Sequence, residues 1–433
     1  MMLFSTSDRN HRASFARAVD RGIAPDGGLY LPEHYPWFSP EFFAHTRRRS
    51  FAETAFDVAR RFLSDEIPER VLGDIAADAF SFPVPLHRLD DRLSVLELFH
   101  GPTLAFKDIG ARFMARVMRW LHRDDDRDIV VLVATSGDTG GAVASGFAGV
   151  AGVRVVLCYP GGRVSPLQEL QLTTGGETTT TLRVEGTFDD CQRLVKQAFE
   201  DPELSRGRTL TSANSINIAR LLPQTFYFVS TWGEVYQERR RTVFVIPSGN
   251  FGNLTAGLMA RAMGVGAAEM VAAMNVNDVF AEYLQRGTYT PRMAIRTLSN
   301  AMDVGDPSNL ARVRALFADD LTAMRRVIST RSFTDQETRD AVREAFQQYG
   351  YVFDPHGAVA YRAARAYLSG RGDDSQAVIL ATAHPAKFPE ALEEDQRVAA
   401  GFPEALRDLE RRPQRQKPIN ASYDELREIL RAL

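Results

Sequence analysis

The sequence predicts an α/β protein in which mostly parallel sheets are covered by helices. Short β-branched runs at 129–134 and 242–246 are each followed by a glycine-rich turn and then by a helical pattern. The runs at 153–158 and 377–381 also lead into turns that contain glycine or proline. Buried strands that alternate with helices are typical of parallel sheets. The repetition of this unit predicts the same fold class for most of the chain.

The N-terminal residues follow a different pattern. Helical periodicity is interrupted there by proline- and glycine-rich turns at 24–28 and 32–40. Because such turns end helices, we expect residues 1–92 to form a mostly helical N-terminal domain. The strand–turn–helix pattern begins at residue 93 and defines a second region, 93–433, within which about 128–210 is expected to form a smaller subdomain.

Two later segments carry weaker signals. Between 277 and 348 the pattern is helical, with loops near Pro291 and at 304–308. The tail after Arg411 is charged, and we expect it to lie at the periphery of the fold.

Composition excludes several classes of partner. The 433 residues include 52 basic and 55 acidic side chains, which gives a net charge of -3. Such a chain has no general attraction for nucleic acid or anionic lipid, and no apolar run approaches the roughly 18 residues of a membrane span. The arginine-rich N-terminus lacks the apolar segment of a secretion signal, and there are only two cysteines. We therefore expect a cytoplasmic protein that binds neither nucleic acid nor membrane.

Lysine is scarce in this chain. Only four of the 52 basic residues are lysines, namely Lys107, Lys196, Lys387 and Lys417. Since arginine supplies most of the surface charge, a lysine inside a motif indicates chemistry that needs an amine able to lose its proton.

Lys107 is the strongest candidate for such an amine. It follows an apolar run that begins after Gly101-Pro102, at a predicted helix start. Near a helix N-terminus and in apolar surroundings an ammonium is destabilised, so its pKa falls. This favours a lysine that forms a Schiff base. The alternative is a solvated lysine at the start of a helix, which the scarcity of lysine and the flanking Gly-Pro disfavour.

The segment 248–253 predicts a phosphate cradle between a strand and a helix. Two glycines allow close backbone approach, and the helix N-terminus offers unpaired N–H donors. It lacks the lysine of a Walker loop and the spacing of a dinucleotide fingerprint. The alternative is a helix cap without a ligand. The candidate residues are Gly249, Asn250, Phe251, Gly252 and Asn253.

Two other segments have the composition of anion sites. Residues 136–140, Ser-Gly-Asp-Thr-Gly, suit a carboxylate or another small anion, although Asp138 could simply cap the following helix. Residues 212–220 gather amides, hydroxyls and a guanidinium at a helix opening, although they could equally be a polar cap followed by a solvated arginine.

Together, the lysine segment, the two glycine loops and Leu380–Phe388 resemble the threonine synthase family. That family belongs to the tryptophan-synthase-β-like, fold type II class of pyridoxal-phosphate enzymes. The resemblance includes Gly22–Tyr30, Glu185–Gln192 and Thr297–Asp303, so it covers almost the whole chain. It implies a fold type II enzyme whose catalytic region is 93–433, with pyridoxal 5′-phosphate as cofactor and no metal.

The resemblance implies roles for individual residues around the cofactor. Lys107 would hold the cofactor covalently and move protons once substrate displaces it. The amides of 249–253 would bind the cofactor phosphate, with Asn250 and Asn253 adding side-chain donors. Thr382 would meet the pyridine nitrogen, and a hydroxyl there leaves that nitrogen largely unprotonated.

It also implies roles around the substrate. Ser136, Thr139 and neighbouring backbone amides would hold the substrate carboxylate. Asn214, Ser215 and Arg220 would hold the substrate phosphate.

Asp138 departs from the pattern of the wider class. An asparagine usually occupies this position and faces the 3′ oxygen of the cofactor. Because a carboxylate would repel a phenolate, we expect Asp138 to point elsewhere or to share a proton.

The implied reaction converts O-phospho-L-homoserine and water to L-threonine and phosphate, by γ-elimination of phosphate and addition of water at Cβ. The nearest alternative is a phospho-lyase of the same fold, which would release a keto acid and ammonia. A non-catalytic cofactor-binding module is disfavoured by the presence of Lys107 and Thr382. We expect a small-molecule substrate and a chain that acts as a monomer or a homodimer.

Overall fold

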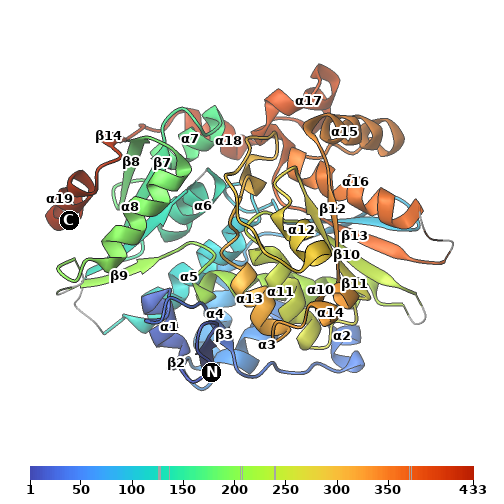
Figure 1. Ribbon diagram of the computed structural model, residues 1–433, viewed down its shortest axis with the longest axis horizontal. Helices are drawn as coiled ribbons and strands as arrows, with labels where there is room; N and C mark the ends of the chain where they lie inside the picture. Colours follow the sequence, from blue (N-terminus) through green and yellow to red (C-terminus); the bar gives the residue numbers. More distant parts are fainter. Residues whose placement is uncertain are drawn as a thin grey trace.

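Three β-sheets organise the chain, as Figure 1 shows. The structure, a computed structural model, describes residues 1–124, 128–135, 137–204, 206, 208–237, 240–369, 371 and 373–433. Within these residues strands and helices alternate from β5 onward, which confirms the predicted α/β fold.

Helices surround all three sheets. Four helices, α3, α7, α8 and α15, begin with a capping box. In each, the Ser or Thr before the helix accepts from the backbone N–H of the third helical residue, and the side chain of that residue accepts from the backbone N–H of the Ser or Thr, so two otherwise free N–H groups are satisfied. No described helix is long and apolar enough to cross a membrane. In chain order the α-helices are α1 (Phe15–Arg21), α2 (Pro40–Thr46), α3 (Phe51–Leu63), α4 (Glu69–Ala79), α5 (Lys107–Leu121), α6 (Asp138–Phe147), α7 (Pro166–Thr173), α8 (Phe188–Glu200), α9 (Ile218–Leu221), α10 (Gln224–Val235), α11 (Gly252–Ala262), α12 (Val279–Arg286), α13 (Leu310–Leu316), α14 (Leu321–Val327), α15 (Asp335–Tyr349), α16 (Pro355–Ser369), α17 (Glu394–Ala400), α18 (Glu404–Glu410) and α19 (Tyr423–Ala432). Three short 3-10 helices are η1 (Asn300–Met302), η2 (Pro385–Lys387) and η3 (Pro389–Ala391).

The largest sheet has six strands and is parallel except at one edge. Its order is β12 (Ile328–Ser332), β11 (Glu269–Met274), β10 (Thr242–Pro247), β13 (Gln376–Ala381), β5 (Leu93–Glu97) and β4 (Leu86–Arg88), with β4 antiparallel to β5. Along β10, Phe244 and Ile246 belong to the core that includes α10 and α11, whereas Val243 and Val245 belong to the core that includes α16. Because both faces are covered in this way, every residue of β10 is buried, and all of them after Thr242 are apolar.

The second sheet has five strands, all parallel. Its order is β14 (Lys417–Asn420), β8 (Thr179–Glu185), β7 (Val153–Pro160), β6 (Asp128–Ala134) and β9 (Arg208–Ser212). Along β6, Val131 and Val133 join the main core, and Val130 and Leu132 join a separate core under α8 and α19.

The N-terminal residues form a small antiparallel sheet together with α1 to α4. Its strands, in the order β2 (Arg12–Ser14), β1 (Met2–Ser5) and β3 (Tyr30–Pro32), were not predicted from the sequence. Helices α2 and α3 pack against α10, so this part of the chain adjoins the underside of the largest sheet in Figure 1.

One prediction about the later segments was wrong, because the segment 277–348 contains a strand, β12, that pairs parallel with β11. The tail after Arg411 lies at the outer edge of the fold, as expected (Figure 1). It is nevertheless packed, because β14 extends the five-stranded sheet at β8 and α19 packs against α8. Ile419, Leu426 and Leu430 are buried in the core of that sheet.

This packing predicts that the tail contributes to stability. Leu426 is fully buried, so Leu426→Ala should lower the apparent free energy of unfolding by about 2–5 kcal/mol. Urea unfolding followed by circular dichroism measures the change. Glu428→Ala, on the exposed side of the same helix, serves as the control and should stay within about 0.5 kcal/mol of the parent protein. Equal stabilities for the two variants would contradict the assigned packing.

Candidate active site

A cleft of about 620 Å³ opens where the carboxyl ends of parallel strands from both large sheets meet. Lys107 and Thr382 line it beside the six-stranded sheet, and Thr135 and Thr139 line it beside the five-stranded sheet. Ligands bind at this edge in open α/β proteins, because the loops after each strand converge there.

A short antiparallel contact positions Lys107 beside Thr382. Ala105 and Ala383 form an isolated bridge, and the amide of Phe106 donates to the carbonyl of Thr382 at 2.9 Å. Lys107 is the next residue and the first of α5. The contact therefore fixes the reactive amine relative to the segment that follows β13.

The turn before Lys107 is held by the carboxylate of Asp108. This carboxylate accepts hydrogen bonds from the amide and the hydroxyl of Thr103, at 2.8 and 2.7 Å. A Cβ on Gly101 would lie 2.5 Å from the Asp108 Oδ2, so the turn requires glycine at that position. Burial raises the pKa of Asp108 to about 6, although the bonds from Thr103 oppose the shift.

The Lys107 amine has no hydrogen-bond partner among the described residues. Its Nζ lies 5.9 Å from the centre of the Phe106 ring, and the side chain is partly exposed to the cleft. Desolvation lowers the pKa of Lys107, with Lys387 and Arg220 adding to the effect and Asp138 opposing it. A lowered pKa leaves more of the neutral amine near neutral pH, which is the form that attacks a carbonyl.

The loop 248–253 lies between β10 and α11 and lines the same cleft. A Cβ on Gly249 would lie 2.6 Å from the Cα of Met302, so only glycine fits there. Phe251 has a φ of 58° and a ψ of 13°, a left-handed conformation that is uncommon outside glycine. This strained turn ends at the N-terminus of α11, where amides from Gly252 onward are free of intrahelical partners.

The two asparagines of this loop have different surroundings. Asn250 is bonded at both ends of its amide, to the Ser215 hydroxyl at 3.0 Å and to the Ser308 amide at 2.7 Å. Its side chain holds the loop, and the second hydrogen of its Nδ2 remains available as a donor. Asn253 accepts from the Tyr227 hydroxyl at 2.7 Å, but its Nδ2 is buried without a partner among the described residues.

The segment 212–220 lies against this loop. Asn214 joins two strand ends, because its Nδ2 donates to the carbonyl of Ala134 at 2.9 Å. The Ser215 hydroxyl accepts from Asn250 and from Asn309, so its own proton remains available. Arg220 is buried and donates to the carbonyl of Ala213, but its Nε has no partner in the described part of the chain.

These orphaned donors fit an anionic ligand. Burial lowers the pKa of Arg220 to about 10, with the Asp108 charge opposing the shift, so the guanidinium stays charged at neutral pH. A buried donor without a partner costs about 1–3 kcal/mol, and Arg220 Nε and Asn253 Nδ2 are two such donors among the described residues, which anionic groups bound in the cleft would satisfy. The residues present therefore suit a ligand that carries phosphate.

The loop 136–140 is arranged differently from the sequence-based expectation. Ser136 lies outside the described residues. Thr135 accepts the amides of Gly137 and Gly140 at 3.0 and 2.8 Å, so these two donors are not free for a carboxylate. Thr139 lines the cleft.

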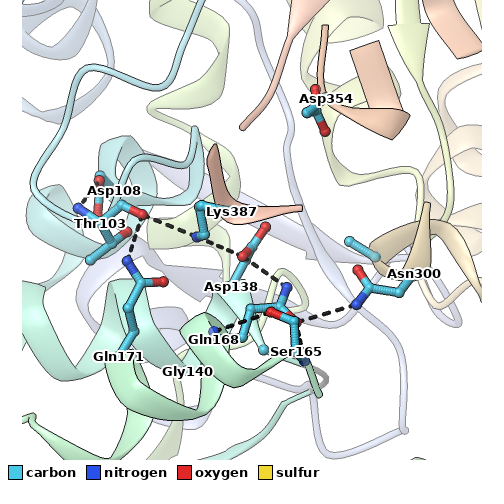
Figure 2. A network of polar contacts seen from close by, with 12 residues as sticks. Thr103, Asp108, Asp138, Gly140, Ser165, Gln168, Gln171, Asn300, Asp354 and Lys387 are labelled. Carbon is cyan, nitrogen blue, oxygen red and sulfur yellow. Dashed lines mark hydrogen bonds and ion pairs between the residues drawn. The ribbon is translucent and has the colours of Figure 1, made fainter. Parts of the chain in front are cut away.

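Asp138 points to a protein cation, as Figure 2 shows. Its Oδ1 lies 2.7 Å from the Nζ of Lys387. Burial alone would raise the pKa of Asp138, but Lys387 and Lys107 more than compensate and hold it well below the usual range. The carboxylate therefore stays ionised.

An aspartate–histidine pair that the sequence analysis missed borders the cleft. The Nδ1 of His356 lies 2.5 Å from the Oδ2 of Asp354, and its Nε2 accepts the amide of Ala301 at 3.1 Å. The pair holds η1, whose residues line the cleft.

Other lining residues come from motifs that had been noted without a role. Phe188, Asp189 and Gln192 belong to the segment 185–192, and Asn300 to Asp303 belong to 297–303. Three or more His, Cys, Asp or Glu side chains placed to hold a metal do not occur among the described residues.

An α/β fold with a desolvated lysine and an anion cradle at its strand ends defines a pyridoxal-phosphate-dependent enzyme, and residues 82–383 match the family described as pyridoxal-phosphate dependent enzyme. Residues 2–80 match the threonine synthase N terminus, and residues 357–430 match the threonine synthase C-terminal region. The chain belongs to the threonine synthase family.

Similarity to individual proteins extends over the full length. A threonine synthase of Serratia marcescens is 41% identical over 434 residues, covering 100% of both chains. The crystal structure of threonine synthase from Escherichia coli matches with a TM-score of 0.91 and 39% identity over 100% of both chains. A threonine synthase of Brucella melitensis with bound pyridoxal phosphate matches with a TM-score of 0.91 and 34% identity, over 100% of this chain and 99% of that one. The chain is thus a pyridoxal-phosphate-dependent lyase of threonine biosynthesis.

The geometry predicts which lysine holds the cofactor. Lys107 alone of the four lysines lines the cleft, whereas Lys387 is fully buried in its ion pair. Borohydride reduction of the yellow protein should therefore fix the cofactor to Lys107. Peptide mass spectrometry locates the adduct, and its appearance on Lys387 would show that the assignment is wrong.

The loop geometry predicts a strong effect of charge at Gly252. Gly252→Asp places a carboxylate where the cofactor phosphate is expected, so the dissociation constant for pyridoxal phosphate should rise at least about 100-fold, or ~2.8 kcal/mol. Absorbance titration measures it. Gly252→Ala is the matched control, because its Cβ would lie 3.3 Å from the Ser215 Cβ and adds no charge. A similar loss in both variants would point to packing rather than phosphate binding.

Proposed function

We propose that this enzyme converts O-phospho-L-homoserine and water to L-threonine and phosphate. The observation that carries the proposal is that a single desolvated amine, Lys107, lies in a cleft with unpartnered anion donors, in a chain similar to threonine synthases over its full length. The proposal assigns the catalysis to residues 93–433, with about 128–210 as the smaller subdomain.

Pyridoxal phosphate, when bound, supplies an electron sink that makes protons on the substrate carbons acidic. Lys107 is assigned to hold the cofactor in the resting enzyme. After the substrate amine displaces it, Lys107 is the base that accepts the Cα proton and later returns a proton. Its lowered pKa supports this role, because a base must be neutral before it accepts a proton.

Three groups are assigned to the cofactor. The amides of 249–253 and the Nδ2 of Asn253 bind the phosphate, as the free donor at Asn253 suggests. Asn250 and Phe251 shape that loop. The hydroxyl of Thr382, which hydrogen-bonds no other described residue, is assigned to the pyridine nitrogen.

The remaining polar groups are assigned to the substrate. Arg220 and Ser215 bind the phosphate that leaves, because both retain a donor in the cleft. Thr139 binds the substrate carboxylate together with Ser136. Asn214 supports the loop through its bond to Ala134.

We also infer a cytoplasmic location and a monomer or homodimer. Both cysteines are buried and unpaired, which suits a reducing compartment. Sedimentation velocity would separate the two oligomeric states.

The reaction is tested by its products and by an oxygen label. Incubated with O-phospho-L-homoserine, the enzyme should release threonine and phosphate in equal amounts. In heavy-oxygen water the label should enter the threonine hydroxyl and not the phosphate, because elimination breaks the Cγ–O bond and water then adds at Cβ. Mass spectrometry of both products measures the label.

Two other outcomes would overturn the proposal. Labelled phosphate together with homoserine would show attack of water at phosphorus, which needs no electron sink. A large yield of 2-ketobutyrate and ammonia would show that the enzyme is a phospho-lyase of the same fold.

A further inference from the structure

The charges of two of the four lysines in this chain, Lys387 and Lys107, act on the carboxylate of Asp138. Lys387 is fully buried, and its Nζ lies 2.7 Å from the Oδ1 of Asp138 and donates to the carbonyl of Thr103 at 3.1 Å (Figure 2). The Asp138 side chain is 4% exposed. Two charges this deeply buried are stable only when they pair, so each one requires the other.

The carboxylate is held from a second side. Gln168, on α7, donates to the Asp138 Oδ1 at 3.1 Å. The Oε1 of Gln168 in turn accepts from the Ser165 amide at 3.1 Å and from Asn300 Nδ2 at 3.2 Å. With these bonds the glutamine side chain has one orientation, and Asp138 is kept against Lys387.

The charge of the same carboxylate also acts on the Lys107 amine, whose pKa it raises. The charged groups that act on Lys107 are Asp138 from α6, Lys387 from η2 and Arg220 from α9. Those that act on Asp138 are Lys387, Lys107 and, from α16, His356. Asp138 is the only anion in the first set, and an anion that paired with Lys107 would favour its ammonium form.

We propose that Lys387 is a positioning residue for Lys107: by binding the Asp138 carboxylate it prevents an ion pair between Asp138 and Lys107, and so leaves the Lys107 amine free to react with an aldehyde. This inference rests on the role assigned to Lys107 in the proposed function. Lys387 does not contact the reacting atoms, because it is fully buried behind the cleft lining.

The scarcity of lysine makes a direct test possible. When the full chain is produced with ¹³C-labelled lysine, its NMR spectrum contains signals from only four lysine side chains. The labelled carbon next to each amine reports its titration, and Lys-to-Arg variants assign the four signals. Titration before pyridoxal phosphate is added follows each amine separately. Lys196 is 78% exposed and Lys417 is also exposed, so both serve as internal references. Lys107 should titrate at lower pH than these two.

Three variants separate the proposed role from a purely structural one. Lys387→Met frees the Asp138 carboxylate, so the Lys107 titration should move up by at least one pH unit. The capture of pyridoxal phosphate at pH 7 should then slow about tenfold, because one pH unit changes the neutral fraction tenfold. Asp138→Asn removes the negative charge that raises the pKa of Lys107 and should move the titration down. The double variant Lys387→Met with Asp138→Asn should return it close to the parent value.

An unchanged Lys107 titration in Lys387→Met would overturn the inference, as would a double variant that keeps the upward shift. If Lys387→Met does not fold, Asp138→Asn still decides, because an upward shift there contradicts the proposed effect. Failure of the proposed function would look different. If the cofactor were found on another lysine, or if the products did not include threonine, the proposed function would fail. The titration shifts expected for the three variants would still be observed.

Discussion

The antiparallel contact between residues 104–106 and 382–384 is the constraint on which the site depends. Strands β5 and β13 are neighbours in the six-stranded sheet, and the chain segments that leave them stay paired through the Ala105–Ala383 bridge. Leu104 adopts a φ of 57°, which costs about 1–2 kcal/mol for an ordinary residue and persists because hydrogen bonds on both sides fix the turn. This pairing fixes the positions of Lys107 and Thr382 relative to each other.

Much of the fold and the lysine and glycine motifs could be predicted from the sequence, because their signals are local. A buried parallel strand is a nearly continuous apolar run, as in β10 after Thr242, and the glycines at 249 and 252 mark a turn into a helix. The requirement for glycine at 249, however, comes from the backbone of Met302, which is distant in the chain. The motif predicts the loop, and the tertiary structure supplies the reason for it.

Features that rest on distant partners could not be predicted. The strand β14 reads Lys-Pro-Ile-Asn, with only Ile419 buried, and it becomes a strand because β8 offers an open edge. The edge strand β12 is polar at every residue after Ile328, and it becomes a strand because it pairs with β11. The pairing of Asp138 with Lys387 and that of His356 with Ala301 join segments whose sequence motifs show no sign of each other.

The late position of β14 in the chain has a consequence for synthesis. The ribosome delivers β8 well before β14, so the outer edge of the five-stranded sheet carries unpaired N–H and C=O groups while the rest of the chain is made. An open strand edge is a template for pairing with other chains. Until the ribosome has made β14, the edge of β8 is therefore open to pairing with other chains, and the last residues of the sequence are the ones that cover it.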